Sequence, residues 1–203
     1  MNLQKLFETQ KVLDDKIVKE KGLEGQGLLD KKILALQVEL GELANEWRGF
    51  KFWSEDQEPN VKCPTCKGNG YDTFLGVTQR DTPCCRCNGY PENVNPLLEE
   101  YVDGLHFILS IGNDLGVEVS KLDLLETCSH QDITSVFSEL MIMLPDCLLG
   151  HGRHDIESAH EIYEICLANF IQLGSMLGFT WQQIEQAYYD KNKVNHERQN
   201  NGY

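Results

Sequence analysis

The stretch ALQVELGELANEWRGFKFWS, residues 35–54, combines the hydrophobic spacing of a buried helix with acidic side chains beside it. At 100° per residue, its apolar positions fall within roughly 60° of one another and predict one core-facing stripe. The acidic positions share a second arc, centred roughly 100° away. The apolar positions are Leu36, Leu40, Leu43 and Trp47, and the acidic ones are Glu39, Glu42 and Glu46. Because neighbouring carboxylates repel, this arrangement favours a cation between them.

A second acidic pair follows in LLEEYVDGLHF, residues 97–107, where Glu100 and Asp103 repeat the three-residue spacing. Two antiparallel helices that each carry such a pair can form a four-carboxylate cluster inside a bundle. Oxygen ligands without histidine or thiolate favour Mg²⁺ or Mn²⁺, and Mg²⁺ tends to complete its coordination with water and substrate phosphates. The pattern therefore predicts a metal that holds phosphate, with a solvated acidic face as the alternative.

The rest of the chain has the periodicity of a helical bundle. Thr180 and Gln183 form a capping box at the start of the last expected helix. The expected helices span residues 3–20, 27–48, 97–115, 132–149, 155–177 and 181–199. The sequence therefore predicts an all-α fold of about six helices.

Residues 56–95 differ from this pattern, because their prolines and glycines leave no segment in which a helix is expected. Two cysteine pairs have the form C-x₂-C-x₁₇-C-x₂-C, which is typical of a closed, structural zinc site. The expected zinc ligands are Cys63, Cys66, Cys84 and Cys87. Cys85 could replace one of them, and two disulfides are the alternative to zinc. We expect a zinc-ribbon-like module at 56–95, with short strands such as Phe74 to Thr78, inserted into a helical domain of residues 1–55 and 96–203.

The C-terminal segment YYDKNKVNHERQNNGY carries basic and amide side chains on one helical face. Lys191, Asn195 and Arg198 follow at i, i+4 and i+7, within roughly 60° of one another. Such a face fits a phosphate ligand. The alternative is an exposed terminal helix whose basic residues complement the helix dipole.

Composition excludes several classes of function. The chain of 203 residues has a formal net charge of -14 and a pI near 4.8, so we expect no strong binding to nucleic acid or to anionic membranes. It contains no run of 18 apolar residues, and its first residues have no basic segment followed by an apolar one, so we expect neither a membrane span nor a signal peptide. These features predict a cytoplasmic protein without a membrane span.

Four segments together resemble one family: ELGELANEW, FKFWS, EEYVDGLHF and KNKVNHERQNNGY. The chain is similar to the dimeric, all-α dUTPases, which are relatives of the MazG-type nucleotide pyrophosphohydrolases. The resemblance covers nearly the whole chain outside the cysteine insert. It implies a homodimer that hydrolyses dUTP to dUMP and pyrophosphate with Mg²⁺.

The resemblance also implies roles for individual residues. Either Glu39 or Glu42 would act as general base on the attacking water, and Trp53 and Phe107 would enclose the nucleoside. Gln10 would contact the pyrimidine, although this chain has Asp14 where the family usually has asparagine. The magnesium ligands would be Glu39, Glu42, Glu100 and Asp103, and the phosphate-binding residues Lys191, Asn195 and Arg198.

Three alternatives remain open from the sequence. A broader pyrophosphohydrolase would act on dCTP as well as dUTP, and the ambiguous base pocket does not separate the two. A carboxylate-bridged di-iron bundle would require ExxH spacings on two helices, whereas Asp103 and His106 supply one such spacing. A zinc-ribbon adaptor that merely dimerises would leave the basic face without a role.

Overall fold

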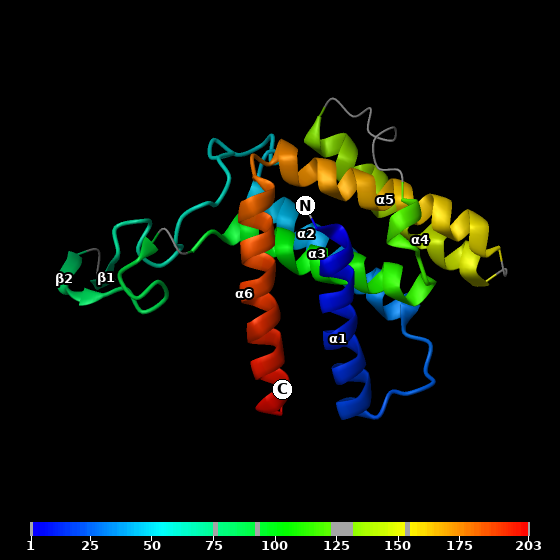
Figure 1. Cartoon of the computed structure of the whole chain (residues 1–203). Helices are drawn as coiled ribbons and strands as arrows, with labels where there is room; N and C mark the ends of the chain where they lie inside the picture. Colours follow the sequence, from blue (N-terminus) through cyan, green and yellow to red (C-terminus); the bar gives the residue numbers. More distant parts are fainter. Residues whose placement is uncertain (1, 75–76, 92–93, 123–131, 153–154, 203) are drawn as a thin grey trace.

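The computed structural model describes residues 2–74, 77–91, 94–122, 132–152 and 155–202 (Figure 1). These residues form an all-α bundle with six α-helices, as the sequence predicts, and each helix ends within a few residues of its expected bounds. The helices are α1 (Leu3–Lys21), α2 (Leu29–Trp47), α3 (Pro96–Leu115), α4 (Ile133–Gly152), α5 (Ile156–Met176) and α6 (Trp181–Asn200), with a short 3₁₀ helix at Val119–Lys121.

Local signals in the sequence explain several of the helix boundaries. The side chain of Asn95 accepts a hydrogen bond from the backbone of Leu98, and Pro96 stands at the first turn of α3, where no backbone donor is needed. The predicted capping box of Thr180 and Gln183 is present at the start of α6.

The helices α2 and α3 lie antiparallel at the centre of the bundle. Lys32 near the start of α2 pairs with Asp114 near the end of α3. At the opposite end, the backbone of Asn60 bonds to Glu46 and to Leu97, which joins the end of α2 to the start of α3. The helices α4 and α5 pack against each other on one side of α2 and α3, and α1 and α6 lie on another side (Figure 1).

Two reciprocal contacts between α3 and α5 fix the core. The hydroxyl of Tyr163 on α5 donates to the Ile108 carbonyl of α3 at 3.0 Å, and the hydroxyl of Tyr101 on α3 donates to the Phe170 carbonyl of α5 at 3.1 Å. In each case a glycine stands four residues after the bonded carbonyl, where a side chain would meet the tyrosine ring. These glycines are Gly112 and Gly174.

Replacing Gly112 by alanine is expected to lower the free energy of unfolding by about 1–3 kcal/mol, because the new methyl group would overlap the buried Tyr163 ring. The change is measured by urea denaturation. Gly27→Ala is the matched control, since a methyl group there meets nothing within 4 Å. Equal stability of the two variants would contradict the close packing of α3 on α5.

The cysteine insert leaves the bundle between α2 and α3 and ends in a two-stranded hairpin (Figure 1). The expectation of one strand from Phe74 to Thr78 is wrong in its extent. Phe74 ends β1 (Tyr71–Phe74), Val77 begins β2 (Val77–Pro83), and the two residues pair across the antiparallel sheet. Residues 75–76, which the expected strand included, lie outside the described residues.

Within the described residues, no single helix is both long and apolar enough to cross a membrane. Taken together, α5 and α6 are long and apolar enough for a membrane span, but the two helices are bent by 109° relative to each other.

Candidate active site

Three of the four predicted metal ligands meet where α2 packs against α3. Carboxylate oxygens of Glu39, Glu42 and Glu100 all lie within 4.8 Å of one another. Burial, together with the nearby negative charges of Asp103 and Glu42, raises the pKa of Glu39 to about 7 and that of Glu100 to about 7. A raised pKa means that the charged form is disfavoured in this arrangement, so a cation bound between the carboxylates would be stabilised.

The fourth predicted ligand, Asp103, has a different partner. Its carboxylate accepts a hydrogen bond from the ammonium group of Lys191 on α6, with 2.5 Å between Nζ and Oδ2. Both side chains are partly buried. The structure therefore joins a predicted metal ligand to a predicted phosphate-binding residue, and each neutralises the other.

A pocket of about 390 Å³ lies among α1, α2, α3 and α6, within the size range of small-molecule sites. Glu39 and Asp103 line it from α2 and α3. The basic face of α6 lines the same pocket with Lys191, Asn195 and Arg198. The geometry places acidic and basic groups around one volume, which is the arrangement that a metal-bound phosphate chain requires.

Gln10 lies at the wall of this pocket and is 3% exposed. Its side-chain oxygen accepts from the Tyr188 hydroxyl at 3.0 Å and lies 2.7 Å from Nδ1 of His106, while its amide nitrogen donates to Asp14 at 2.8 Å. Phe107 also lines the pocket. Both residues therefore lie where a nucleoside could reach them.

Trp53 does not line the pocket, and 65% of its surface is exposed. Its ring packs edge-on against Phe50 and Phe52 in the segment after α2, with ring centroids 5.8 and 5.0 Å away. The structure of one chain therefore does not bring Trp53 to the other candidate residues, and its role as a nucleoside contact stays a prediction.

Three further polar residues that line the pocket were not predicted to belong to the nucleotide site: Lys32, His106 and Ser110. A regular signal could have found all three. His106 and Ser110 follow Asp103 at three and seven residues, and Lys32 precedes Glu39 by seven, so each continues a helical face already marked by a carboxylate. A polar side chain on such a face can equally be exposed to solvent, so polarity alone did not predict that these residues line the pocket.

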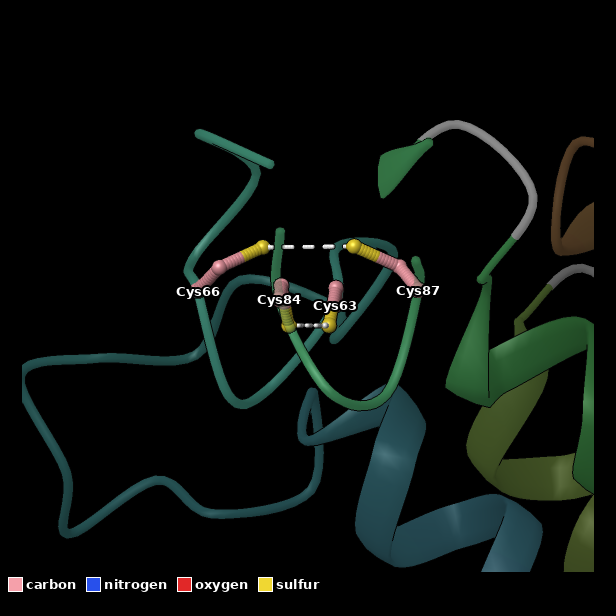
Figure 2. A group of neighbouring side chains, drawn as sticks. All are labelled: Cys63, Cys66, Cys84 and Cys87. Carbon is pink, nitrogen blue, oxygen red and sulfur yellow. Dashed lines mark hydrogen bonds between the residues drawn. The ribbon is translucent and has the colours of Figure 1, made fainter. Parts of the chain in front are cut away.

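The four predicted zinc ligands converge in the insert, where two cysteine pairs face each other (Figure 2). Their sulfur atoms all lie within 4.8 Å of one another, with 3.8 Å between Cys63 and Cys84 and 3.7 Å between Cys66 and Cys87. A tetrahedral zinc with Zn–S bonds of about 2.3 Å places its sulfur atoms about 3.8 Å apart. A disulfide bond requires about 2.05 Å between its two sulfur atoms. The buried cluster therefore has the geometry of a metal site and not that of two disulfides.

The insert also contacts the helical body close to the carboxylates. Arg86, within the second cysteine pair, forms an ion pair of 3.3 Å with Glu99 on α3. Glu99 directly precedes Glu100 in the sequence. Because both partners are about half exposed, this contact contributes little stability by itself.

Comparison with known proteins gives the family. The family described as dUTPase matches residues 2–63 and 87–203, which include all six helices and omit most of the cysteine insert. No curated protein matches the chain. The match spans the carboxylate cluster, the basic face of α6 and the pocket between them, and dUTPases generally use a divalent metal. The chain therefore belongs to the all-α dUTPase family and is a dUTP diphosphatase.

Proposed function

We propose that the protein hydrolyses dUTP to dUMP and pyrophosphate with Mg²⁺ held by Glu39, Glu42, Glu100 and Asp103. The observation that carries this proposal is the meeting of three carboxylates within 4.8 Å at the edge of a pocket whose other wall is basic. The carboxylate cluster alone, or the basic wall alone, would not distinguish an active site from a charged surface.

The residues fit magnesium by their chemistry. They offer carboxylate oxygens without thiolate, and the raised pKa values of Glu39 and Glu100 reflect burial and mutual repulsion that a cation would relieve. Bound Mg²⁺ would supply positive charge that offsets the triphosphate and polarises its oxygens.

The protein's own side chains perform the remaining tasks. Either Glu39 or Glu42 accepts the proton of the attacking water, which requires an ionised carboxylate within hydrogen-bond reach. Lys191 and Arg198 donate hydrogen bonds to phosphate oxygens whose charge grows in the transition state. Lys191 exchanges its bond to Asp103 for one to phosphate, which leaves Asp103 available as a ligand.

The test offers dUTP, dCTP, dTTP and dATP separately to the purified protein at saturating Mg²⁺ and quantifies monophosphate and pyrophosphate. The proposal expects dUMP and pyrophosphate in equal amounts. Release from several nucleotides at similar rates would identify a broader pyrophosphohydrolase, and release from none would refute the activity.

We also propose that the two cysteine pairs bind one structural Zn²⁺. Their sulfur distances support a closed tetrahedral site without an open coordination position. An insert of this size buries few apolar side chains, so the metal would stabilise most of its structure.

Cys63→Ser is expected to lose the zinc that the wild-type protein carries at one equivalent per chain, as measured by elemental mass spectrometry. The insert should then become sensitive to limited proteolysis, because its folding depends on the metal. Cys85→Ser is the matched control and should keep full zinc content, since Cys85 is exposed beside the buried cluster. Zinc loss in the control, or its retention in Cys63→Ser, would contradict the assignment.

A homodimer is proposed as the working unit. Large apolar side chains are exposed on α2 and α4, with 62% of Leu34, 50% of Val38 and 70% of Ile142 accessible in one chain. Together on neighbouring helices, these side chains would supply apolar area for an interface between two chains. Sedimentation velocity should give a mass of two chains, and a monomer at micromolar concentration would refute the proposal.

A further inference from the structure

The cysteine insert is bonded to both helices that carry the carboxylate cluster. Asn60 lies three residues before Cys63, and its backbone contacts the two helices at once. Its N–H donates to the Glu46 carbonyl of α2 at 2.9 Å, and its carbonyl accepts from the Leu97 N–H of α3 at 3.1 Å. Both partners belong to helix ends, where backbone groups lack a partner within the helix. One residue of the insert therefore joins the end of α2 to the start of α3.

The other end of the insert connects the cysteine cluster to α3. Val94 is 8% exposed and packs with the four buried cysteines. The next residue, Asn95, caps α3, since its side chain accepts a hydrogen bond from the Leu98 backbone at 3.2 Å. Arg86, inside the second cysteine pair, adds the ion pair with Glu99. The first turn of α3 is therefore held by contacts that come from the cysteine cluster.

These contacts lie one helical turn from the predicted magnesium ligands. Glu46 follows Glu42 by four residues on α2, and Leu97 precedes Glu100 by three residues on α3. One turn corresponds to about 5.4 Å along a helix axis. Because the carboxylate cluster contains side chains from both helices, the distances between its oxygen atoms change whenever the start of α3 shifts relative to α2.

Magnesium is sensitive to such a shift. It requires nearly octahedral coordination with bonds of about 2.0–2.1 Å, so ligands from two helices bind it well at one separation of those helices. Among the described residues of the insert, the buried apolar side chains are Val94 and the four cysteines. So small a core leaves the order of the insert to zinc. Without zinc, Asn60 and Val94 would no longer hold the two helix ends together.

On the basis of the proposed function, we propose that the zinc-bound insert sets the affinity of the carboxylate cluster for its divalent metal, with Asn60, Val94 and Arg86 as positioning residues. Zinc orders the insert, the ordered insert fixes the start of α3 against α2, and Glu100 then lies at the right distance from the carboxylates of α2. Zinc should raise the affinity for the divalent metal about tenfold. By linkage, the divalent metal should raise the affinity for zinc by the same factor.

The test measures Mn²⁺ binding in the absence of nucleotide, from the electron paramagnetic resonance signal of the free ion. Mn²⁺ is the probe because it prefers oxygen ligands, as Mg²⁺ does. Cys63→Ser, which is expected to lack zinc, should bind Mn²⁺ about tenfold more weakly than the wild-type protein. Cys85→Ser is the control and should keep both its zinc and the wild-type affinity for Mn²⁺.

Asn60→Pro tests the same connection with zinc in place. The N–H of Val61 donates to the Pro59 carbonyl at 3.0 Å, and Asn60, the central residue of this γ-turn, has a negative φ that proline can adopt. The substitution removes the N–H that bonds to Glu46 and keeps the turn. It should weaken Mn²⁺ binding about threefold at full zinc content. Asn60→Ala keeps that N–H and should bind Mn²⁺ like the wild-type protein.

Two further measurements separate this coupling from a general loss of stability. Gly112→Ala changes the packing of α3 twelve residues beyond Glu100, so it should lower stability and keep the wild-type affinity for Mn²⁺. Saturating Mg²⁺ should lower the dissociation constant for zinc about tenfold in the wild-type protein, as measured by competition with a zinc-binding dye. Glu100→Gln should remove most of that effect, because the coupling acts through this ligand.

The outcomes distinguish this inference from the proposed function, because metal binding needs no hydrolysis. Equal affinity for Mn²⁺ in the wild-type protein, Cys63→Ser and Asn60→Pro would overturn the inference and leave dUTP hydrolysis intact. No binding of Mn²⁺ by the wild-type protein would overturn both. Circular dichroism checks folding, and if Cys63→Ser does not fold, the results for Asn60→Pro and for the effect of Mg²⁺ on zinc affinity decide.

Discussion

Replacing Glu42 by glutamine is expected to lower kcat for dUTP by about 10²–10⁴-fold while nucleotide binding is retained. Glutamine keeps the shape of the side chain and one ligand oxygen but cannot accept a proton from water. Glu42 belongs to the three-carboxylate cluster, where its negative charge also raises the pKa values of Glu39 and Glu100. Turnover is measured by pyrophosphate release and binding by calorimetry with a non-hydrolysable dUTP analogue.

Glu46→Gln is the control for this experiment. Glu46 lies four residues after Glu42 on the same helix and does not belong to the cluster, so its replacement should leave kcat within about twofold of wild type. Near-wild-type turnover in Glu42→Gln would remove Glu42 from the proton transfer. A larger loss in Glu39→Gln would then assign that step to Glu39.

Replacing Lys191 by methionine is expected to lower kcat/KM for dUTP by about 10²–10³-fold. Lys191 lies beside the carboxylates, with its ammonium group 2.5 Å from Asp103 and its charge acting on both Glu39 and Glu100. The variant loses a donor to the phosphate and also leaves Asp103 without its counter-ion in a partly buried site. Methionine keeps the length and apolar stem of the side chain, so the loss reports on the charge.

Lys193→Met provides the comparison, since Lys193 is an exposed cation on the same helix and does not line the pocket. If the two variants lost activity equally, the effect would come from the general charge of α6. In that case the specific contact between Lys191 and Asp103 would have no role in the reaction.

The periodicity of single helices was enough to predict much of this site. The stripe containing Leu36 and Leu40 is buried, and Glu39 and Glu42 lie beside it, because both facts follow from 100° per residue along one helix. Glu100 joins them because an apolar face on α3 packs against that stripe in antiparallel order. The zinc ligands could also be predicted, because the spacing of the two C-x₂-C pairs is by itself typical of a zinc site.

Contacts between distant segments could not be predicted in the same way. Lys191 and Asp103 are 88 residues apart, and their pairing depends on how α6 packs against α3. The network of Gln10, Asp14 and Ser110 likewise requires α1 to lie along α3. Trp53 follows the end of α2, where no helical period sets the direction of a side chain, and it proved to be exposed.

The most direct test of the account measures the rate of dUMP release from dUTP as a function of Mg²⁺ concentration. Divalent metal is removed from the buffers by ion exchange and not by a soluble chelator, so that zinc in the cysteine cluster is left in place. The account predicts no release without Mg²⁺ and a saturable rise to full activity as Mg²⁺ is added, with pyrophosphate released in equal amount. Full activity in the metal-depleted buffer, or no release of dUMP at any Mg²⁺ concentration, would contradict it.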